Sequence, residues 1–223
     1  MSDLPLLALF LWGTVAGLDQ ASVLQGLLSR PLVTGAVSGA IVGDLESGLR
    51  IGAVLELFAL DVLPVGASRY PDFGAATVAA VALGAGETWE LALGPSVLLG
   101  LLYASAAGWT LVVQRRVTAW ALRRHQAELD RGDPGVARRV HGIGLGAELG
   151  RSALVSALAL LSAALVAGAP RLDVPTGRAL ALVVVVGGLA AVTGGALRRA
   201  GTMRRFGWLL GGALAGLAGA MLR

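Results

Sequence analysis

Long apolar runs separated by short polar patches make up most of this chain. Four runs hold close to the roughly 20 apolar residues that a helix needs to cross about 30 Å of hydrocarbon at 1.5 Å per residue. They are residues 91–113, 152–169, 177–197 and 206–222. An earlier run, 4–18, follows an acidic start and precedes no small-residue cleavage site, so we interpret it as a first membrane helix and not as a signal peptide. The pattern predicts an all-α polytopic integral membrane protein.

The N-terminal half also contains apolar segments that are too short to span a membrane. They are residues 31–43, 48–60 and 73–86. The first gives about 20 Å of helix before Asp44. Short segments interrupted by glycine, proline and carboxylates indicate re-entrant helical hairpins, which are tolerated at membrane depth only where protein or a wet cavity surrounds them. Transporters build their binding sites from such breaks.

Glycines recur at four-residue spacing in two of these short segments. They are Gly35, Gly39 and Gly43, followed by Gly48 and Gly52. Small residues at this spacing let two helix backbones approach closely inside a membrane. We expect them to shape the hairpin rather than to contact a ligand.

An arginine-rich polar stretch, residues 114–139, separates the two halves of the chain, and a second basic loop contains Arg198, Arg199, Arg204 and Arg205. The positive-inside rule places both on the cytoplasmic side. The two spans between them are consistent with this, because an even number of crossings returns the chain to the same side. Val113, Val117, Trp120 and Ala121 recur at helical spacing, which is typical of a basic amphipathic helix at the membrane surface.

This helix is either a solvated linker or a docking surface for a soluble partner. The predicted organisation is a membrane region at 1–113, a cytoplasmic linker at 114–141 and a second membrane region at 142–223.

Composition supports the membrane class and excludes several others. The chain is 56% hydrophobic and 14% charged, with a net charge of +4 and a mean hydropathy of +0.75. It has no lysine and no cysteine, which excludes a phosphate-binding GxxxxGK[ST] loop, disulfides and thiol catalysis. Its arginines lie beside apolar runs, so we expect no nucleic-acid binding. His125 and His141 lack partners at ligand spacing, so we expect no metal and no cofactor.

Carboxylates in the N-terminal half are the candidate site residues. Glu56 lies within "AVLELFAL", where a charge requires a partner or water, and Arg50 and Arg69 are the candidate ion-pair partners. Asp72 follows Pro71, and it either caps the next helix or offers hydrogen-bond acceptors to a polyhydroxylated ligand. Asp44 either caps the turn between two short helices or reaches into the site.

The segment from residue 29 to 76 resembles the N-terminal signature of enzyme IIC of the mannose/fructose/sorbose class of the bacterial phosphotransferase system. The matching positions are Arg30, Pro31, Leu32, Gly39, Gly43, Asp44, Gly48, Gly52, Leu55, Glu56, Gly66, Ala67, Pro71 and Asp72. The resemblance covers about a fifth of the chain.

The resemblance implies a permease subunit in the bacterial cytoplasmic membrane. In this family, the subunit pairs with a membrane subunit, IID, and passes a hexose-type sugar to a cytoplasmic IIAB component that phosphorylates it. The complex is oligomeric, and phosphoryl transfer occurs on the partner subunits, so we do not expect this chain to be an enzyme.

Under this hypothesis, the sugar-binding groups come from Glu56, Asp72, Asp44 and Gln25. The alternative is a solitary IIC-like scaffold or regulatory protein without coupled phosphorylation.

Overall fold

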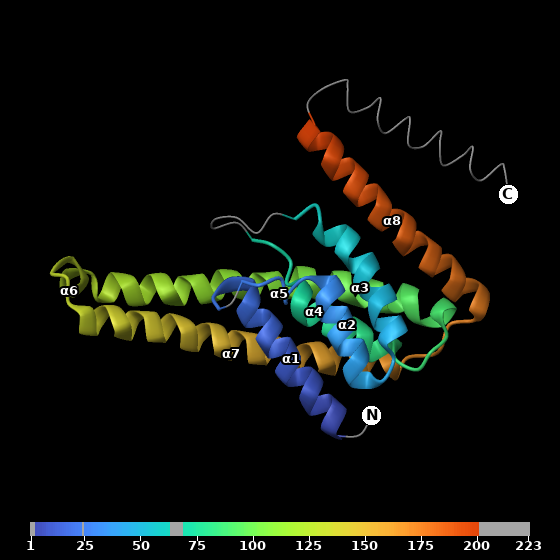
Figure 1. Cartoon of the computed structure of the whole chain (residues 1–223), viewed down its shortest axis with the longest axis horizontal. Coiled ribbons are helices and arrows are strands. Elements are labelled where there is room, and N and C mark those ends of the chain that lie inside the picture. Colours follow the sequence, from blue (N-terminus) through green and yellow to red (C-terminus); the bar gives the residue numbers. More distant parts are fainter. Residues whose placement is uncertain (1–2, 24, 63–68, 201–223) are drawn as a thin grey trace.

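The computed structural model describes residues 3–23, 25–62 and 69–200, and all regular elements in these ranges are helices (Figure 1). In chain order they are α1 (Asp3–Ala21), α2 (Pro31–Val42), α3 (Leu45–Ala59), α4 (Phe73–Gly84), α5 (Trp89–Arg124), α6 (Gln126–Asp130), α7 (Pro134–Ala167) and α8 (Val174–Ala200). Gly66 of the signature and the expected span at 206–222 lie outside the described residues.

Four helices are long and apolar enough to cross a membrane, namely α1, α5, α7 and α8. Each contains all or most of one of the apolar runs identified in the sequence. The prediction of an all-α polytopic membrane protein is therefore confirmed, and the chain is a multi-pass membrane protein.

Helices α2 and α3 form the short hairpin that the glycine pattern predicts. Gly43 ends α2 in the left-handed conformation, with φ at 78°, and the chain reverses there. A Cβ atom built on Gly35 would lie 2.5 Å from the carbonyl oxygen of Gly48, and one built on Gly52 would lie 2.6 Å from that of Pro31. The two backbones are thus in direct contact at Gly35, Gly39, Gly48 and Gly52, whereas Gly43 forms the turn and a Cβ atom there would meet nothing within 4 Å.

Helix α4 occupies the centre of the fold. It contacts α1, α2, α3, α5 and α7, and all but two of its residues are buried. With 12 residues, it is about 18 Å long. The third short segment of the sequence is therefore an interior helix surrounded by protein.

Helices α5 and α7 form a long antiparallel pair joined by α6 at its tip (Figure 1). Residues 114–124 continue α5 without a break, so the expected separate amphipathic helix is instead the distal part of α5. The composition boundaries at 113 and 142 likewise fall inside α5 and α7. A turn separates α6 from α7, since Gly132 has φ at 77° and Asp133 caps α7.

Candidate functional site

Glu56, near the end of α3, is paired with Arg30, which precedes α2. The Arg30 Nε atom donates to Glu56 Oε1 at 2.7 Å, and a second guanidinium nitrogen contacts the same oxygen. The other carboxylate oxygen accepts a hydrogen bond from the backbone N–H of Leu32 at 3.2 Å. That N–H belongs to the first turn of α2, where unpaired backbone donors favour an anion. The Glu56 side chain is 18% exposed, so it stays within reach of a ligand.

The partners that we expected for Glu56 are incorrect. Arg50 instead forms an ion pair with Glu46 one turn away on α3. The guanidinium of Arg69 lies over the ring of Trp109, 4.2 Å from its centroid. Arg30 was identified in the sequence only as part of a motif, because its 26-residue separation from Glu56 gives no helical spacing to reveal the pair.

Asp44 caps α3, which was one of its two expected roles. Its carboxylate accepts hydrogen bonds from the backbone N–H groups of Ser47 at 3.1 Å and Gly86 at 3.3 Å. These hydrogen bonds, that from Ser47 foremost, hold the pKa of Asp44 below its usual value. Asp44 lies at the α2–α3 turn, whereas Glu56 contacts the start of α2, so the two carboxylates lie at opposite ends of this hairpin.

Gln25 lies in the α1–α2 loop, exposed, at the same end of the hairpin as Glu56. It has φ at 48°, an uncommon left-handed conformation for a residue other than glycine. Asp19 of α1 holds this loop in place, since its buried carboxylate accepts hydrogen bonds from the N–H groups of Gly26 at 2.6 Å and Ser29 at 2.9 Å. The loop is therefore anchored just after its exposed amide side chain.

Asp72 caps α4 through the N–H of Ala75, as expected, and it is completely buried. Its second oxygen accepts a hydrogen bond from Arg151 of α7 at 2.7 Å. The same guanidinium binds Glu148 through Nε at 2.9 Å and through a terminal nitrogen at 2.7 Å. In this arrangement Asp72 has no exposed surface for a ligand, and its contact with sugar stays a prediction. Its visible role is to attach α4 to α7.

Glu148 and Arg151 were not identified from the sequence. The apolar run begins at residue 152, so both charges lie just outside it in the sequence, but α7 begins at Pro134. Their i, i+3 spacing within "AELGRSAL" was the available signal, because it places a carboxylate and a guanidinium on one face of a helix. Glu148 keeps one buried oxygen without a hydrogen-bond partner among the described residues.

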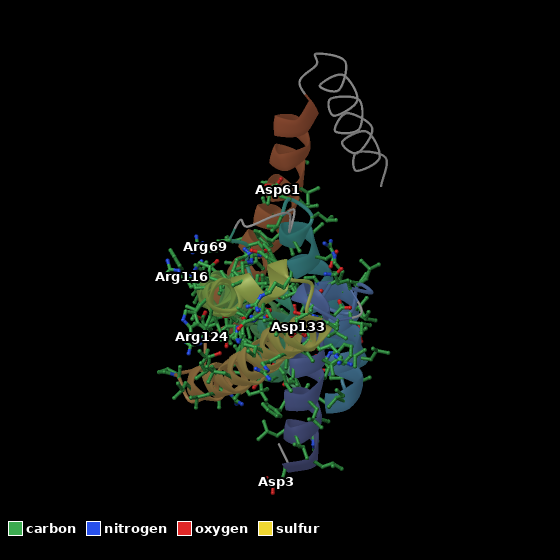
Figure 2. The ribbon with its side chains drawn as sticks, turned by 90° about the vertical axis from the view of Figure 1, so that its left-hand side faces the viewer. Asp3, Asp61, Arg69, Arg116, Arg124 and Asp133 are labelled. Carbon is green, nitrogen blue, oxygen red and sulfur yellow. The ribbon has the colours of Figure 1, made fainter. Side chains whose placement is uncertain are left out.

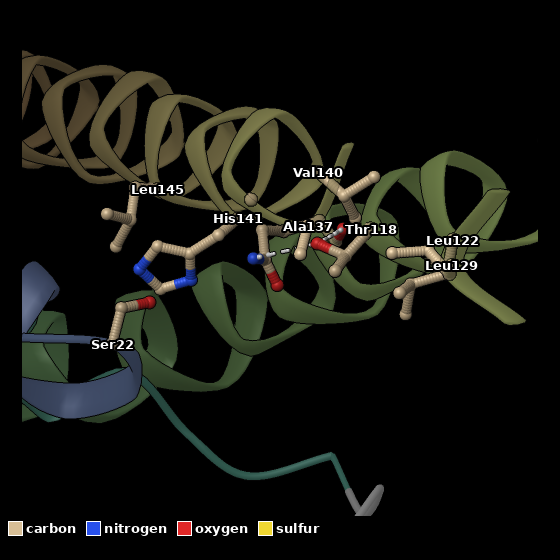
Figure 3. Close-up of a pocket in the computed structure, with 10 residues that line it drawn as sticks. Ser22, Thr118, Leu122, Leu129, Ala137, Val140, His141 and Leu145 are labelled. Atoms are coloured by element: carbon tan, nitrogen blue, oxygen red, sulfur yellow. Dashed lines mark hydrogen bonds between the residues drawn. The ribbon is translucent and has the colours of Figure 1, made fainter. Parts of the chain in front are cut away.

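A groove opens between the end of α1 and the α5–α7 pair. It has a volume of about 460 Å³. Figure 3 shows the His141 imidazole and the Ser22 hydroxyl on facing walls, with Thr118 further along the groove. The Gln114 amide also lines it and donates to Thr118 Oγ1 at 3.4 Å. Ser22 belongs to the same loop as Gln25, so the groove adjoins that loop.

The long apolar helices and the short glycine-packed hairpin define a multi-pass membrane protein. The family described as the PTS system sorbose-specific IIC component matches residues 4–200, so this chain belongs to that family. The resemblance proposed from residues 29–76 is thereby confirmed and extends over most of the chain.

Individual members of the family match only part of this chain, at modest sequence identity. The sorbose-specific EIIC component of Klebsiella pneumoniae is 34% identical over 57% of this chain and 46% of its own length. The fructose permease IIC component of Bacillus subtilis (strain 168) is 31% identical over 56% and 45%. The mannose-specific EIIC component of Escherichia coli (strain K12) is 28% identical over 53% and 43%. The chain therefore spans about half the length of the curated relatives it matches.

Two solved structures share the fold. One, described only as a membrane protein, aligns with a TM-score of 0.69 at 21% identity over 100% of this chain and 95% of its own. The cryoEM structure of the mannose transporter ManYZ with microcin E492 aligns with a TM-score of 0.63 at 22% identity over 100% and 94%.

Proposed function

We propose that this protein is the sugar-translocating IIC subunit of a mannose-family phosphotransferase system in the bacterial cytoplasmic membrane. It forms the membrane path with a IID subunit and delivers a hexose-type sugar to a cytoplasmic IIAB component. Family membership supports this assignment, as does the likeness in fold to a mannose transporter complex. Phosphoryl transfer then takes place on the partner subunits.

The observation that carries the proposal is the Arg30–Glu56 pair at the open end of the α2–α3 hairpin. A carboxylate and a guanidinium that orient each other supply fixed acceptors and donors, which match the hydroxyl groups of a sugar. The Arg30 side chain is 31% exposed and that of Glu56 is 18% exposed, whereas Asp72 is buried. We therefore assign the direct contacts with sugar first to Glu56, then to Arg30 and to Gln25 of the adjoining loop.

Uptake of labelled hexoses in cells tests the assignment. Cells that express this chain with its IID and IIAB partners should accumulate phosphorylated sugar in a phosphoenolpyruvate-dependent manner. Glu56→Gln should lower this uptake by about tenfold or more, because it removes a charged hydrogen-bond acceptor. Glu46→Gln is the matched control, since it breaks an exposed ion pair on the same helix and should leave uptake unchanged.

The scaffold or regulatory alternative makes the opposite prediction. If no hexose is taken up in a chain-dependent manner and Glu56→Gln leaves the cellular phenotype unchanged, the transport proposal is wrong.

A further inference from the structure

One face of α5 exposes large apolar side chains along most of the helix. They are Leu98, Leu102, Trp109, Val113, Val117 and Trp120, with exposed fractions of 38% to 71%. Steps of three, four and seven residues place them on one side of the helix. Ala107 and Leu111 are buried on the opposite side, within the fold. The stripe therefore faces away from the protein.

This stripe continues past the end of the apolar sequence. Helix α5 has 36 residues and is about 54 Å long, whereas the hydrocarbon layer is about 30 Å thick. Polar sequence begins at Gln114, yet Val117 and Trp120 remain exposed beyond it. A tryptophan that is 53% exposed, one turn beyond a valine, is typical of the layer between hydrocarbon and water.

Arginines lie among these apolar side chains. Arg116, Arg123 and Arg124 are exposed, and Arg124 lies over the Trp120 ring, 5.7 Å from its centroid. Figure 2 shows Arg69, Arg116 and Arg124 on one side of the molecule. Residues 114–141 contain seven arginines against three carboxylates, so the field around this face is positive.

We propose that this surface binds the anionic headgroup layer of a phospholipid membrane. We define it as the arginine–tryptophan face, formed by Trp109, Val113, Arg116, Val117, Trp120 and Arg124. The apolar side chains lie at the level of the upper acyl chains, and the guanidinium groups bind lipid phosphates. The proposal does not rest on sugar transport, and it places the distal half of α5 against the membrane.

Continuity with the spanning part of α5 favours lipid over an acidic protein as the occupant. Leu98 and Leu102 lie within the apolar run on the same face, and both are exposed in the part of the chain that the structure describes. The arginine–tryptophan face extends that stripe without a change of direction. Guanidinium groups bind phosphate oxygens in a bidentate manner, and tryptophan prefers the headgroup region. Basic segments next to membrane spans recognise anionic lipids through the same chemistry.

Lipid retention by the full chain tests the proposal. The protein is reconstituted in nanodiscs of phosphatidylcholine with one-third phosphatidylglycerol, and its tightly bound lipids are counted by mass spectrometry. Phosphatidylglycerol should be enriched, and Arg116→Gln with Arg124→Gln should reduce the enrichment by about fivefold for each arginine removed. Arg50→Gln with Arg171→Gln is the matched control, since it removes two exposed arginines outside this face.

Fluorescence quenching supplies a second measurement. The difference between the wild type and Trp120→Phe isolates the emission of Trp120. Lipids with a quencher at headgroup depth should quench this emission, and aqueous iodide should not.

Three results would overturn the proposal. The first is equal phosphatidylglycerol retention in both arginine double variants. The second is quenching of Trp120 by iodide alone. The third is binding of poly-glutamate to the protein in phosphatidylcholine nanodiscs, lost in Arg116→Gln with Arg124→Gln, without any effect of phosphatidylglycerol. That result would assign the face to an acidic protein.

Discussion

Arg151 of α7 and Asp72 at the start of α4 lie 79 positions apart in the sequence, and their side chains meet at 2.7 Å in the interior. Thr110 of α5 and the carbonyl oxygen of Gly17 in α1 accept further hydrogen bonds from the same guanidinium. One side chain thus joins α1, α4, α5 and α7. Because residues 69–72 are not helical and Asp72 caps α4, this junction lies where the central helix begins.

Replacing Arg151 with methionine should strongly destabilise the protein. The change leaves two buried carboxylates, Asp72 and Glu148, without their shared cation, which costs about 3–5 kcal/mol. Arg50→Met removes a surface pair and should cost less than about 1 kcal/mol. Thermal unfolding in detergent measures both.

A triple variant separates charge from packing at this junction. Combining Arg151→Met with Asp72→Asn and Glu148→Gln removes every charge in the cluster, and it should be more stable than Arg151→Met alone. If the triple variant is no more stable, uncompensated charge is not what makes the single change harmful.

Gly35→Ala should destabilise the α2–α3 hairpin. The added methyl group would meet the Gly48 carbonyl oxygen at 2.5 Å, and backbone cannot move aside as a side chain does, so we expect a loss of about 1–3 kcal/mol. The same substitution at Gly150 of α7 meets nothing within 4 Å. There it should stabilise by up to about 1 kcal/mol through helix propensity. Equal melting temperatures for the two variants would contradict the packing argument.

Asp19→Asn should loosen the loop that carries Gln25. The amide presents a donor where two backbone N–H groups now bind a carboxylate, and hydrogen bonds of this charged kind are worth about 1.5–3 kcal/mol. Hydrogen exchange of residues 22–30 should therefore accelerate by at least about tenfold. Asp130→Asn, at an exposed acceptor on α6, is the control and should leave that loop unchanged.

The α5–α7 pairing is testable by cross-linking, because the chain contains no cysteine. A Cβ atom on Gly144 would lie 3.8 Å from Thr118 Cγ2, so Thr118→Cys with Gly144→Cys should form a disulfide under mild oxidation. Thr118→Cys with Gly150→Cys lies more than one helical turn out of register and should not. Mass spectrometry of the unreduced peptides distinguishes the two. A cross-link at Gly150 and none at Gly144 would contradict the observed register.

Much of the fold was predictable because the length of an apolar run limits what a helix can do in a membrane. The spans, the short segments and the role of glycines such as Gly48 all follow from this constraint. Partners of charged residues do not follow from it. The sequence shows that Glu56 needs a partner. It does not show that this partner is Arg30, because the chain reversal at Gly43 determines which residues lie beside Glu56. The buried position of Arg151 could not be predicted, because a charged residue next to an apolar run normally marks the end of a membrane span.

Helix α4 has the composition of a membrane segment, yet protein surrounds it on all sides. Its apolar composition therefore reflects burial among protein side chains and not contact with lipid. The hydroxyl of Thr77 is acceptable there because it donates to the Phe73 carbonyl oxygen at 2.7 Å. Substitutions in α4 must therefore conserve side-chain volume more than hydrophobicity. A slightly polar residue of the right size should be tolerated better there than a larger apolar one, the reverse of the rule for a helix that faces lipid.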